Sequence, residues 1–221
     1  MPRSLTILTH RYESGRDLPM LVWRFPQAVR AVASSPLGGG IGLRQWVVNA
    51  TVHRDYDRLD PDVHLREIAD ALGLSGPGTG LLTAVDVGEA VTVAQEGVEV
   101  VATVGLGHPT LAAAPDDGPA NPVGTINIVA LVPVALTDAA LVNAVVTITE
   151  AKVQALREYG LDATGTASDA VFVGCVAGAG AALEPFGGPR STWGARLARA
   201  VYGAVRTGTR HWFGPTDPSR P

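Results

Sequence analysis

Apolar residues in this 221-residue chain form two kinds of pattern, short runs and longer stretches with helical spacing. The short runs are rich in β-branched and aromatic residues and are separated by turn formers such as Ser14-Gly15, which predicts strands. Two runs that flank Glu96-Gly97 predict a hairpin. The continuous apolar run Thr125–Pro133 predicts a central strand. The other predicted strands are Leu5–Thr9, Met20–Phe25, Val29–Ser34, Trp46–Val52, Ala170–Val176 and the hairpin pair Val91–Gln95 and Val98–Gly105.

Three longer stretches have helical spacing and begin at residues that commonly cap helices. The first opens at Asp60-Pro61, with Asp60 as the N-cap, and ends at Gly73. The second reaches Glu158 before Gly160, and the third carries an apolar stripe that includes Leu197 and Val201. The predicted caps of these two helices are Thr137 or Asp138 and Ser191.

The order of these elements is strands, helix, strands, helix, strand and helix. It predicts an α+β fold, a layered single domain with a mixed, mostly antiparallel β-sheet and packed helices. We expect this domain to span residues 1–213 and residues 214–221 to form a disordered tail. Ser75–Gly80 and Pro109–Pro122 are rich in glycine, proline or both and are predicted loops.

The second predicted helix contains Lys152, the only lysine of the chain. At about 100° per residue, Lys152 falls on one line with Leu141, Val145 and Ile148, so it points toward packed protein or a cleft. The alternative is a lysine whose stem covers an apolar edge while its amine reaches water. Glu150 lies on the opposite side of the helix, where periodicity predicts a solvated residue.

Composition narrows the classes of function. The net charge of −4 and the absence of a long basic run argue against nucleic acid as a partner. Residues 67–151 contain no lysine or arginine, which favours either a cationic ligand or a solvated acidic surface. We expect a soluble, cytoplasmic protein with no membrane partner, because neither a signal peptide nor a run of about 20 apolar residues is present. The sequence leaves open whether a homo-oligomer forms.

Several polar groups interrupt apolar segments and are candidates for chemistry. Gly38, Gly39 and Gly40 would let backbone N–H groups approach a ligand oxygen, or would form a simple flexible turn. Asn49, Thr51 and His53 share one strand face, which either lines a cleft or faces solvent. The histidines of the chain have no metal-ligand spacing, so no metal site is predicted. Cys175, the only cysteine, lies in an apolar run and is interpreted as buried and inert.

Two further polar groups follow predicted loops. Thr83 and Asp86 place a hydroxyl and a carboxylate three residues apart, as a helix cap would. A later turn gathers four side-chain oxygens within six residues, and could hold a substrate amide, a phosphate or a nucleophile. It could equally be a turn that starts the next strand. The residues of this turn are Thr164, Thr166, Ser168 and Asp169.

Together these segments resemble the adenosylcobinamide amidohydrolase family. Six matching segments occur in the family's order from about residue 30 to residue 176. They are SSPLGGG (Ser34–Gly40), VVNATVH (Val47–His53), GLLTAVDV (Gly80–Val87), GTINIV (Gly124–Val129), ALVNAVVTITEAKVQAL (Ala140–Leu156) and ATGTASDAV (Ala163–Val171). The chain departs from the expected pattern at Ser168, where many relatives are expected to have threonine, and at Ala167, where many are expected to have a glycine-like residue.

The resemblance implies hydrolysis of the amide that joins aminopropanol to a propionate side chain of adenosylcobinamide. The implied products are adenosylcobyric acid and 1-amino-2-propanol, in corrinoid salvage. The protein itself would need no cofactor, because the cobalt corrinoid is the substrate. The alternatives are a non-catalytic corrinoid-binding protein and an amidase of another bulky amide.

The residue roles are hypotheses from side-chain chemistry. We expect attack by Thr166 or Ser168, or by a water held there, with Asp169 or Lys152 as base or orienting group. The backbone of Gly38–Gly40, with Asn49 or Asn127, would hold the developing oxyanion or the amides of the corrin. The remaining candidates are Glu150 for catalysis and His53, Thr83, Asp86 and Thr164 for substrate binding.

Overall fold

The computed structural model describes residues 4–12, 15–115, 124–178 and 182–214. Within these residues the chain forms an eight-stranded sheet with three α-helices and a short 3-10 helix. In chain order the elements are β1 (Ser4–Arg11), β2 (Asp17–Ala33), β3 (Gly40–Thr51), α1 (Pro61–Ala71), β4 (Gly78–Thr83), η1 (Val87–Glu89), β5 (Val91–Gln95), β6 (Val98–Gly105), β7 (Thr125–Val132), α2 (Asp138–Glu158), β8 (Ala170–Cys175) and α3 (Thr192–Phe213). The predicted α+β class is confirmed.

The strand order is β4-β3-β2-β8-β7-β6-β5, and β1 pairs with β2. The pairs β3–β4 and β7–β8 are parallel, and the other pairs are antiparallel. The long strand β2 joins the two halves of the sheet, because its first part pairs with β1 and its last part with β8. Its register against β3 shifts between Arg24 and Val29. This segment contains Pro26, which cannot donate a ladder hydrogen bond.

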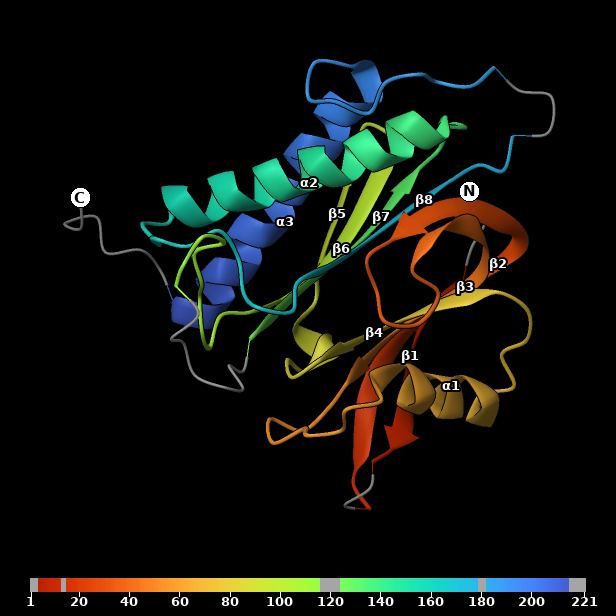
Figure 1. Cartoon of the computed structure of the whole chain (residues 1–221), viewed down its shortest axis with the longest axis vertical. Helices are drawn as coiled ribbons and strands as arrows, with labels where there is room; N and C mark the ends of the chain where they lie inside the picture. Colours follow the sequence, from red (N-terminus) through yellow and green to blue (C-terminus); the bar gives the residue numbers. More distant parts are fainter. Residues whose placement is uncertain (1–3, 13–14, 116–123, 179–181, 215–221) are drawn as a thin grey trace.

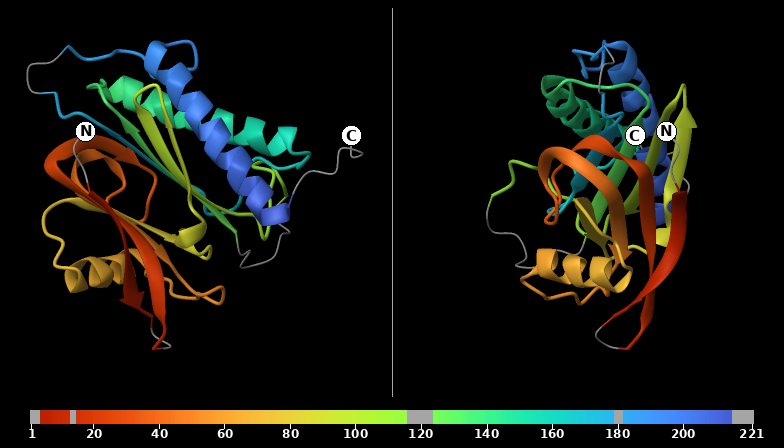
Figure 2. Two further views of the ribbon diagram at one scale, coloured as in Figure 1. Left: turned by 180° about the vertical axis from the view of Figure 1, so that it is seen from behind. Right: turned by 90° about the vertical axis from the view of Figure 1, so that its right-hand side faces the viewer.

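The sheet folds so that its two halves face each other, which gives four layers (Figures 1 and 2). Helices α2 and α3 cover the outer face of β5–β8, and α1 packs against β4 at the far side of the other half. The inner layer is a shared apolar core to which both halves contribute, with Trp23 and Val47 from one half and Val129 and Phe172 from the other. Alternate residues of β2, β3, β6, β7 and β8 therefore point either into this inner core or toward a helix.

The capping predictions are partly confirmed. Thr137, not Asp138, caps α2 by accepting the N–H of Ala140 at 3.1 Å. Ser191 caps α3. Asp60 stands at the N-cap of α1 but makes no capping hydrogen bond.

The guanidinium of Arg58 explains the missing cap at Asp60. It donates to both carboxylate oxygens of Asp60 at 2.9 Å. These hydrogen bonds lower the pKa of the Asp60 carboxyl. The side chain is therefore held by Arg58 and is not available to the first turn of the helix.

Four other predictions need correction or lie partly or wholly outside the described residues. Met20–Phe25 and Val29–Ser34 are one strand, β2, and not two. The predicted loop Ser75–Gly80 is wrong at its end, because Gly78 begins β4. Residues 116–122 of the predicted loop and 215–221 of the predicted tail lie outside the described residues.

Two buried features agree with the sequence. Cys175 is fully buried, and burial raises the pKa of its thiol. Helix α2 is long and apolar enough to cross a membrane by length and composition, but 50% of its most apolar window is buried inside the protein. Its apolar face packs in the core between the helices and β5–β8, which is the arrangement of a core helix.

Candidate active site

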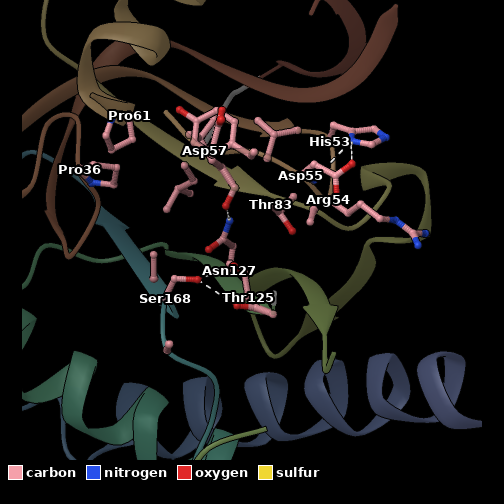
Figure 3. Close-up of a pocket in the computed structure, with 18 residues that line it drawn as sticks. Pro36, His53, Arg54, Asp55, Asp57, Pro61, Thr83, Thr125, Asn127 and Ser168 are labelled. Carbon is pink, nitrogen blue, oxygen red and sulfur yellow. Dashed lines mark hydrogen bonds and ion pairs between the residues drawn. The ribbon is translucent and has the colours of Figure 1, made fainter. Parts of the chain in front are cut away.

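A cavity of about 630 Å³ lies where the two halves of the sheet meet at one edge (Figure 3). Because β3 and β4 are parallel, both carboxyl ends reach this edge, and the amino ends of the parallel pair β7 and β8 lie opposite. The lining residues come from the segment after β3, the end of β4, the start of β7 and the turn before β8. They include His53, Arg54, Asp55, Tyr56, Asp57, Thr83, Thr125, Asn127, Ala167 and Ser168.

Asn127, a buried residue of the cavity lining, is hydrogen-bonded to a second buried asparagine, Asn49, which is not part of that lining. Asn49 follows Val47 by two positions and Asn127 precedes Val129 by two, so both side chains point inward between the half-sheets. The Nδ2 group of Asn127 donates to Asn49 Oδ1 at 2.9 Å and to the carbonyl of Leu82 at 2.8 Å. Asn49 Nδ2 in turn lies 3.2 Å from Thr103 Oγ1. The solvent-face interpretation of Asn49 is therefore wrong, because only 2% of this residue is exposed.

The carbonyl oxygen of Asn127 has no hydrogen-bond partner, although it is buried. A buried acceptor without a partner costs roughly 1–3 kcal/mol of stability. Both hydrogens of Asn127 Nδ2 are already engaged, so as placed this residue presents an acceptor to the cavity and not the donor that an oxyanion requires.

Ser168 is the residue of the predicted hydroxyl-rich turn that lines the cavity. Its hydroxyl lies 2.6 Å from Thr125 Oγ1 and donates to the carbonyl of Gly124 at 2.9 Å. Because Ser168 has a single proton, Thr125 is the donor in the shorter contact when Ser168 donates to Gly124. The two hydroxyls thus form a short chain on one wall, as Figure 3 shows.

Lys152 and Asp169 form an ion pair behind this turn, with only 10% and 13% of their side chains exposed. The Asp169 carboxylate also accepts the N–H of Ile126 at 2.9 Å and the N–H of Thr166 at 3.2 Å. It therefore ties α2, the start of β7 and the turn together. The sequence predicts that Lys152 points toward packed protein or a cleft. It points into packed protein, with only 8% of the residue exposed, and its partner is Asp169.

The other two hydroxyls of the turn face away from the cavity lining. Thr166 Oγ1 lies 2.5 Å from Asp169 Oδ1 and 2.9 Å from the carbonyl of Gly124, so its one proton is shared between two acceptors. Thr164 Oγ1 accepts the N–H of Ala112 at 2.8 Å and holds the segment that follows β6. Neither residue is among those described as lining the cavity.

The wall opposite Ser168 contains His53 and Asp55 (Figure 3). His53 Nδ1 lies 3.3 Å from the carboxylate of Asp55, and 37% of the histidine side chain is exposed. Thr83 also lines the cavity, and its hydroxyl accepts the N–H of Val85 at 3.1 Å. Thr51 does not reach the cavity lining, because its hydroxyl bonds to the carbonyl of Val85 and the N–H of Val87.

Besides Asn49, Lys152, Thr164, Thr166 and Asp169, three more predicted site residues or segments are not part of the lining of this cavity. Asp86 caps η1 by accepting the N–H of Gly88 at 2.8 Å. Glu150 is exposed on the outer side of α2, as periodicity predicts. The carbonyls of Gly38 and Gly39 accept hydrogen bonds from the buried guanidinium of Arg44, and the triplet is absent from the described cavity lining.

The role of the glycine triplet can be tested by a matched pair. Gly38 and Gly40 both have positive φ, 69° and 78°. A Cβ at Gly38 would lie 1.9 Å from the carbonyl oxygen of Gly78, whereas a Cβ at Gly40 has nothing within 4 Å. Gly40→Ala should therefore cost about 1–2 kcal/mol for backbone strain alone. Gly38→Ala should cost at least about 2 kcal/mol more in denaturant unfolding, since a clash with backbone is added. Equal losses of unfolding free energy in the two variants would contradict this placement of the loop.

Sequence reasoning missed several lining residues. Thr125 precedes Asn127 by two positions and so shares its face, which is a signal that the strand pattern contains. Arg54, Asp55 and Asp57 follow His53 directly in a polar run after a predicted strand, where functional loop residues often lie. Among the described residues, no three His, Cys, Asp or Glu side chains gather as metal ligands would.

Known proteins resemble this chain over most of its length. A model of the adenosylcobinamide amidohydrolase family matches residues 5–217. An adenosylcobinamide amidohydrolase of Methanosarcina mazei is 28% identical over 182 residues, which cover 79% of this chain and 88% of that relative. One of Halobacterium salinarum is 41% identical over 115 residues, 49% of this chain and 48% of that relative. A crystal structure of a Pyrococcus horikoshii protein has a TM-score of 0.50 at 10% identity, covering 93% of this chain and 83% of that chain, which is a similarity of fold alone.

Proposed function

This chain belongs to the adenosylcobinamide amidohydrolase family, enzymes that act on an amide bond, and we propose that it hydrolyses the amide between aminopropanol and a corrin propionate. The products would be adenosylcobyric acid and 1-amino-2-propanol, released in corrinoid salvage. The observation that carries the proposal is that Ser168, from the family-like segment Ala163–Val171, lines a cavity together with Asn127 and Thr83 from two other such segments. The corrinoid is the substrate, so the proposal requires no cofactor of the protein's own.

The dimensions of the cavity favour a particular mode of binding. Cavities of roughly 300–1,000 Å³ enclose drug-sized ligands, and a corrinoid is much larger. The side chain that carries the amide would enter the cavity of about 630 Å³, while the macrocycle stays at its mouth. An adjoining cavity of about 330 Å³ shares Arg54 and Thr125 and is also lined by Trp212 and His108. These two rings would offer the macrocycle a flat surface.

Water is the nucleophile in this proposal. Ser168 contacts Thr125 and a backbone carbonyl, neither of which is a base that would remove its proton. Its hydroxyl is better suited to hold a water beside the carbonyl carbon of the amide. His53, whose Nδ1 accepts the backbone N–H of Asp55 at 3.3 Å, lines the same cavity and would take a proton from that water as it attacks. The carbon–nitrogen bond then breaks, and the proton leaves with the amine.

The role of His53 is testable with a matched histidine. His53→Gln should lower kcat at least about 10²-fold, because a positioned proton acceptor contributes at least that much to the rate. His211→Gln changes an exposed histidine of α3 and should leave kcat within about 3-fold, since His211 lines neither of the two cavities. Both variants should keep the melting temperature of the wild type. An active His53→Gln enzyme would remove His53 from the mechanism.

The proposed reaction is tested by incubating the purified protein with adenosylcobinamide and resolving the corrinoids by chromatography. We expect conversion to adenosylcobyric acid, including after treatment with EDTA and without added nucleotide. Tight binding without conversion would favour a corrinoid-binding protein. Cleavage of an unrelated bulky amide with a higher kcat/KM than adenosylcobinamide would favour an amidase of another substrate.

A further inference from the structure

The side-chain amide of Asn127 has a fixed orientation. The carbonyl of Leu82 can only accept a hydrogen bond, so the atom 2.8 Å from it must be the amide nitrogen of Asn127. The second hydrogen of that nitrogen is directed to Asn49 Oδ1 at 2.9 Å. The other terminal atom of the Asn127 side chain is therefore Oδ1. This assignment holds whichever way the side-chain amide of Asn49 is oriented.

The free oxygen of Asn127 is unusual for its surroundings. Only 1% of Asn127 is exposed, and Oδ1 has no hydrogen-bond partner. Most buried polar atoms in folded proteins are paired, so a lone acceptor in the wall of a cavity requires an explanation. The other described atoms without a partner, His10 Nδ1 and Trp23 Nε1, belong to residues that do not line this cavity. A hydrogen-bond donor on a ligand would supply the missing partner of Asn127 Oδ1.

We propose that Asn127 Oδ1 accepts the N–H of the amide that is cleaved, and so selects a secondary amide over an ester or a tertiary amide, neither of which has an N–H. This inference rests on the proposed function and assigns Asn127 as a positioning and specificity residue. In a planar trans amide the N–H and the carbonyl oxygen point in opposite directions. The carbonyl of the bound amide would therefore point away from Asn127, and the developing oxyanion would be stabilised elsewhere.

The same hydrogen bond has a consequence for bond cleavage. When water adds to the carbonyl carbon, the nitrogen becomes pyramidal and gains a lone pair that must be protonated before the amine leaves. With its N–H held by Asn127, the nitrogen directs that lone pair away from this wall, toward the cavity interior. The N–H is retained in the 1-amino-2-propanol product, so the contact persists from the bound substrate to the leaving amine.

The test compares adenosylcobinamide with the ester in which oxygen replaces the amide N–H. The ester places a lone pair against Asn127 Oδ1, and a site built to bind an N–H discriminates strongly against an analogue that lacks it. Asn127→Ala should therefore lower the amide-to-ester ratio of kcat/KM about 10²-fold or more. Thr103→Val is the matched control, because it removes a partner of Asn49 from the same network but leaves Asn127 in place. Its ratio should stay within about 3-fold of wild type.

A merely structural role for Asn127 would lower both activities together and leave the ratio unchanged, which would overturn the inference. Equilibrium dialysis of the Ser168→Ala protein, which should consume the amide only slowly, with the two corrinoids covers the case in which an Asn127 variant fails to fold or no turnover occurs. The amide should bind at least about 10-fold more tightly than the ester. Preferential amide binding without turnover by the wild-type protein would contradict the proposed function alone. Equal binding of the two corrinoids would contradict the role of Asn127.

Discussion

Ser168→Ala is expected to lower kcat about 10²–10³-fold, because loss of the group that holds the attacking water misplaces the nucleophile. The melting temperature should stay close to that of the wild type. Ser168 is exposed, and its partners Thr125 and Gly124 can bond to water when the hydroxyl is removed. The measurement is steady-state turnover of adenosylcobinamide together with thermal unfolding.

Thr164→Ala is the matched control in the same turn. Its hydroxyl holds Ala112 and does not line the cavity, so this change should cost about 1 kcal/mol of stability and leave kcat within a few-fold. If Thr164→Ala loses turnover as severely as Ser168→Ala, the turn acts only as a scaffold and the assignment of Ser168 fails.

Lys152→Met is expected to have the largest effect on stability. It leaves the Asp169 carboxylate buried without its cationic partner, and breaking a buried pair costs about 3–5 kcal/mol. The melting temperature of a chain of this size should fall by roughly 10 °C. Glu150→Gln, an exposed change two residues away on the same helix, should stay within about 0.5 kcal/mol of wild type.

A double-mutant cycle separates the ion pair from the rest of the network. Asp169→Asn removes the carboxylate charge. Lys152→Met should therefore lower the free energy of unfolding by at least about 1 kcal/mol less in the Asp169→Asn background than in the wild-type protein. The opposite result is equally clear. A Lys152→Met protein with unchanged stability and no turnover would make Lys152 a catalytic residue and not the anchor of the turn.

Much of the fold was predictable because it follows from local periodicity. The hairpin about Glu96-Gly97 and the helix that begins after Thr137 have signals within a few residues. Strand β4 was missed because its glycines resemble a loop. A Cβ at Gly78 would lie 1.9 Å from the ring of Trp46. Only glycine therefore fits at this position beside Trp46, a residue distant in sequence. Local patterns contain no such information.

The candidate site was predicted less completely for the same reason. Alternation placed Asn49 and Asn127 on strand faces, but only the folding of the sheet between its two halves brings them within 2.9 Å. Helical periodicity correctly predicted that Lys152 is buried. It could not show that the carboxylate of Asp169 would pair with the lysine's charge. Gly38–Gly40 had the composition of a ligand loop, and the buried guanidinium of Arg44 uses its carbonyls instead.

The central claim is that the chain hydrolyses the aminopropanol amide of adenosylcobinamide at the cavity that contains Ser168. The most direct measurement is mass spectrometry of the products formed in water labelled with oxygen-18. We predict adenosylcobyric acid with a single labelled oxygen in its new carboxyl group and an equal amount of unlabelled 1-amino-2-propanol, both strongly reduced in Ser168→Ala. Recovery of adenosylcobinamide with its amide intact, after prolonged incubation with folded wild-type protein, would contradict the account.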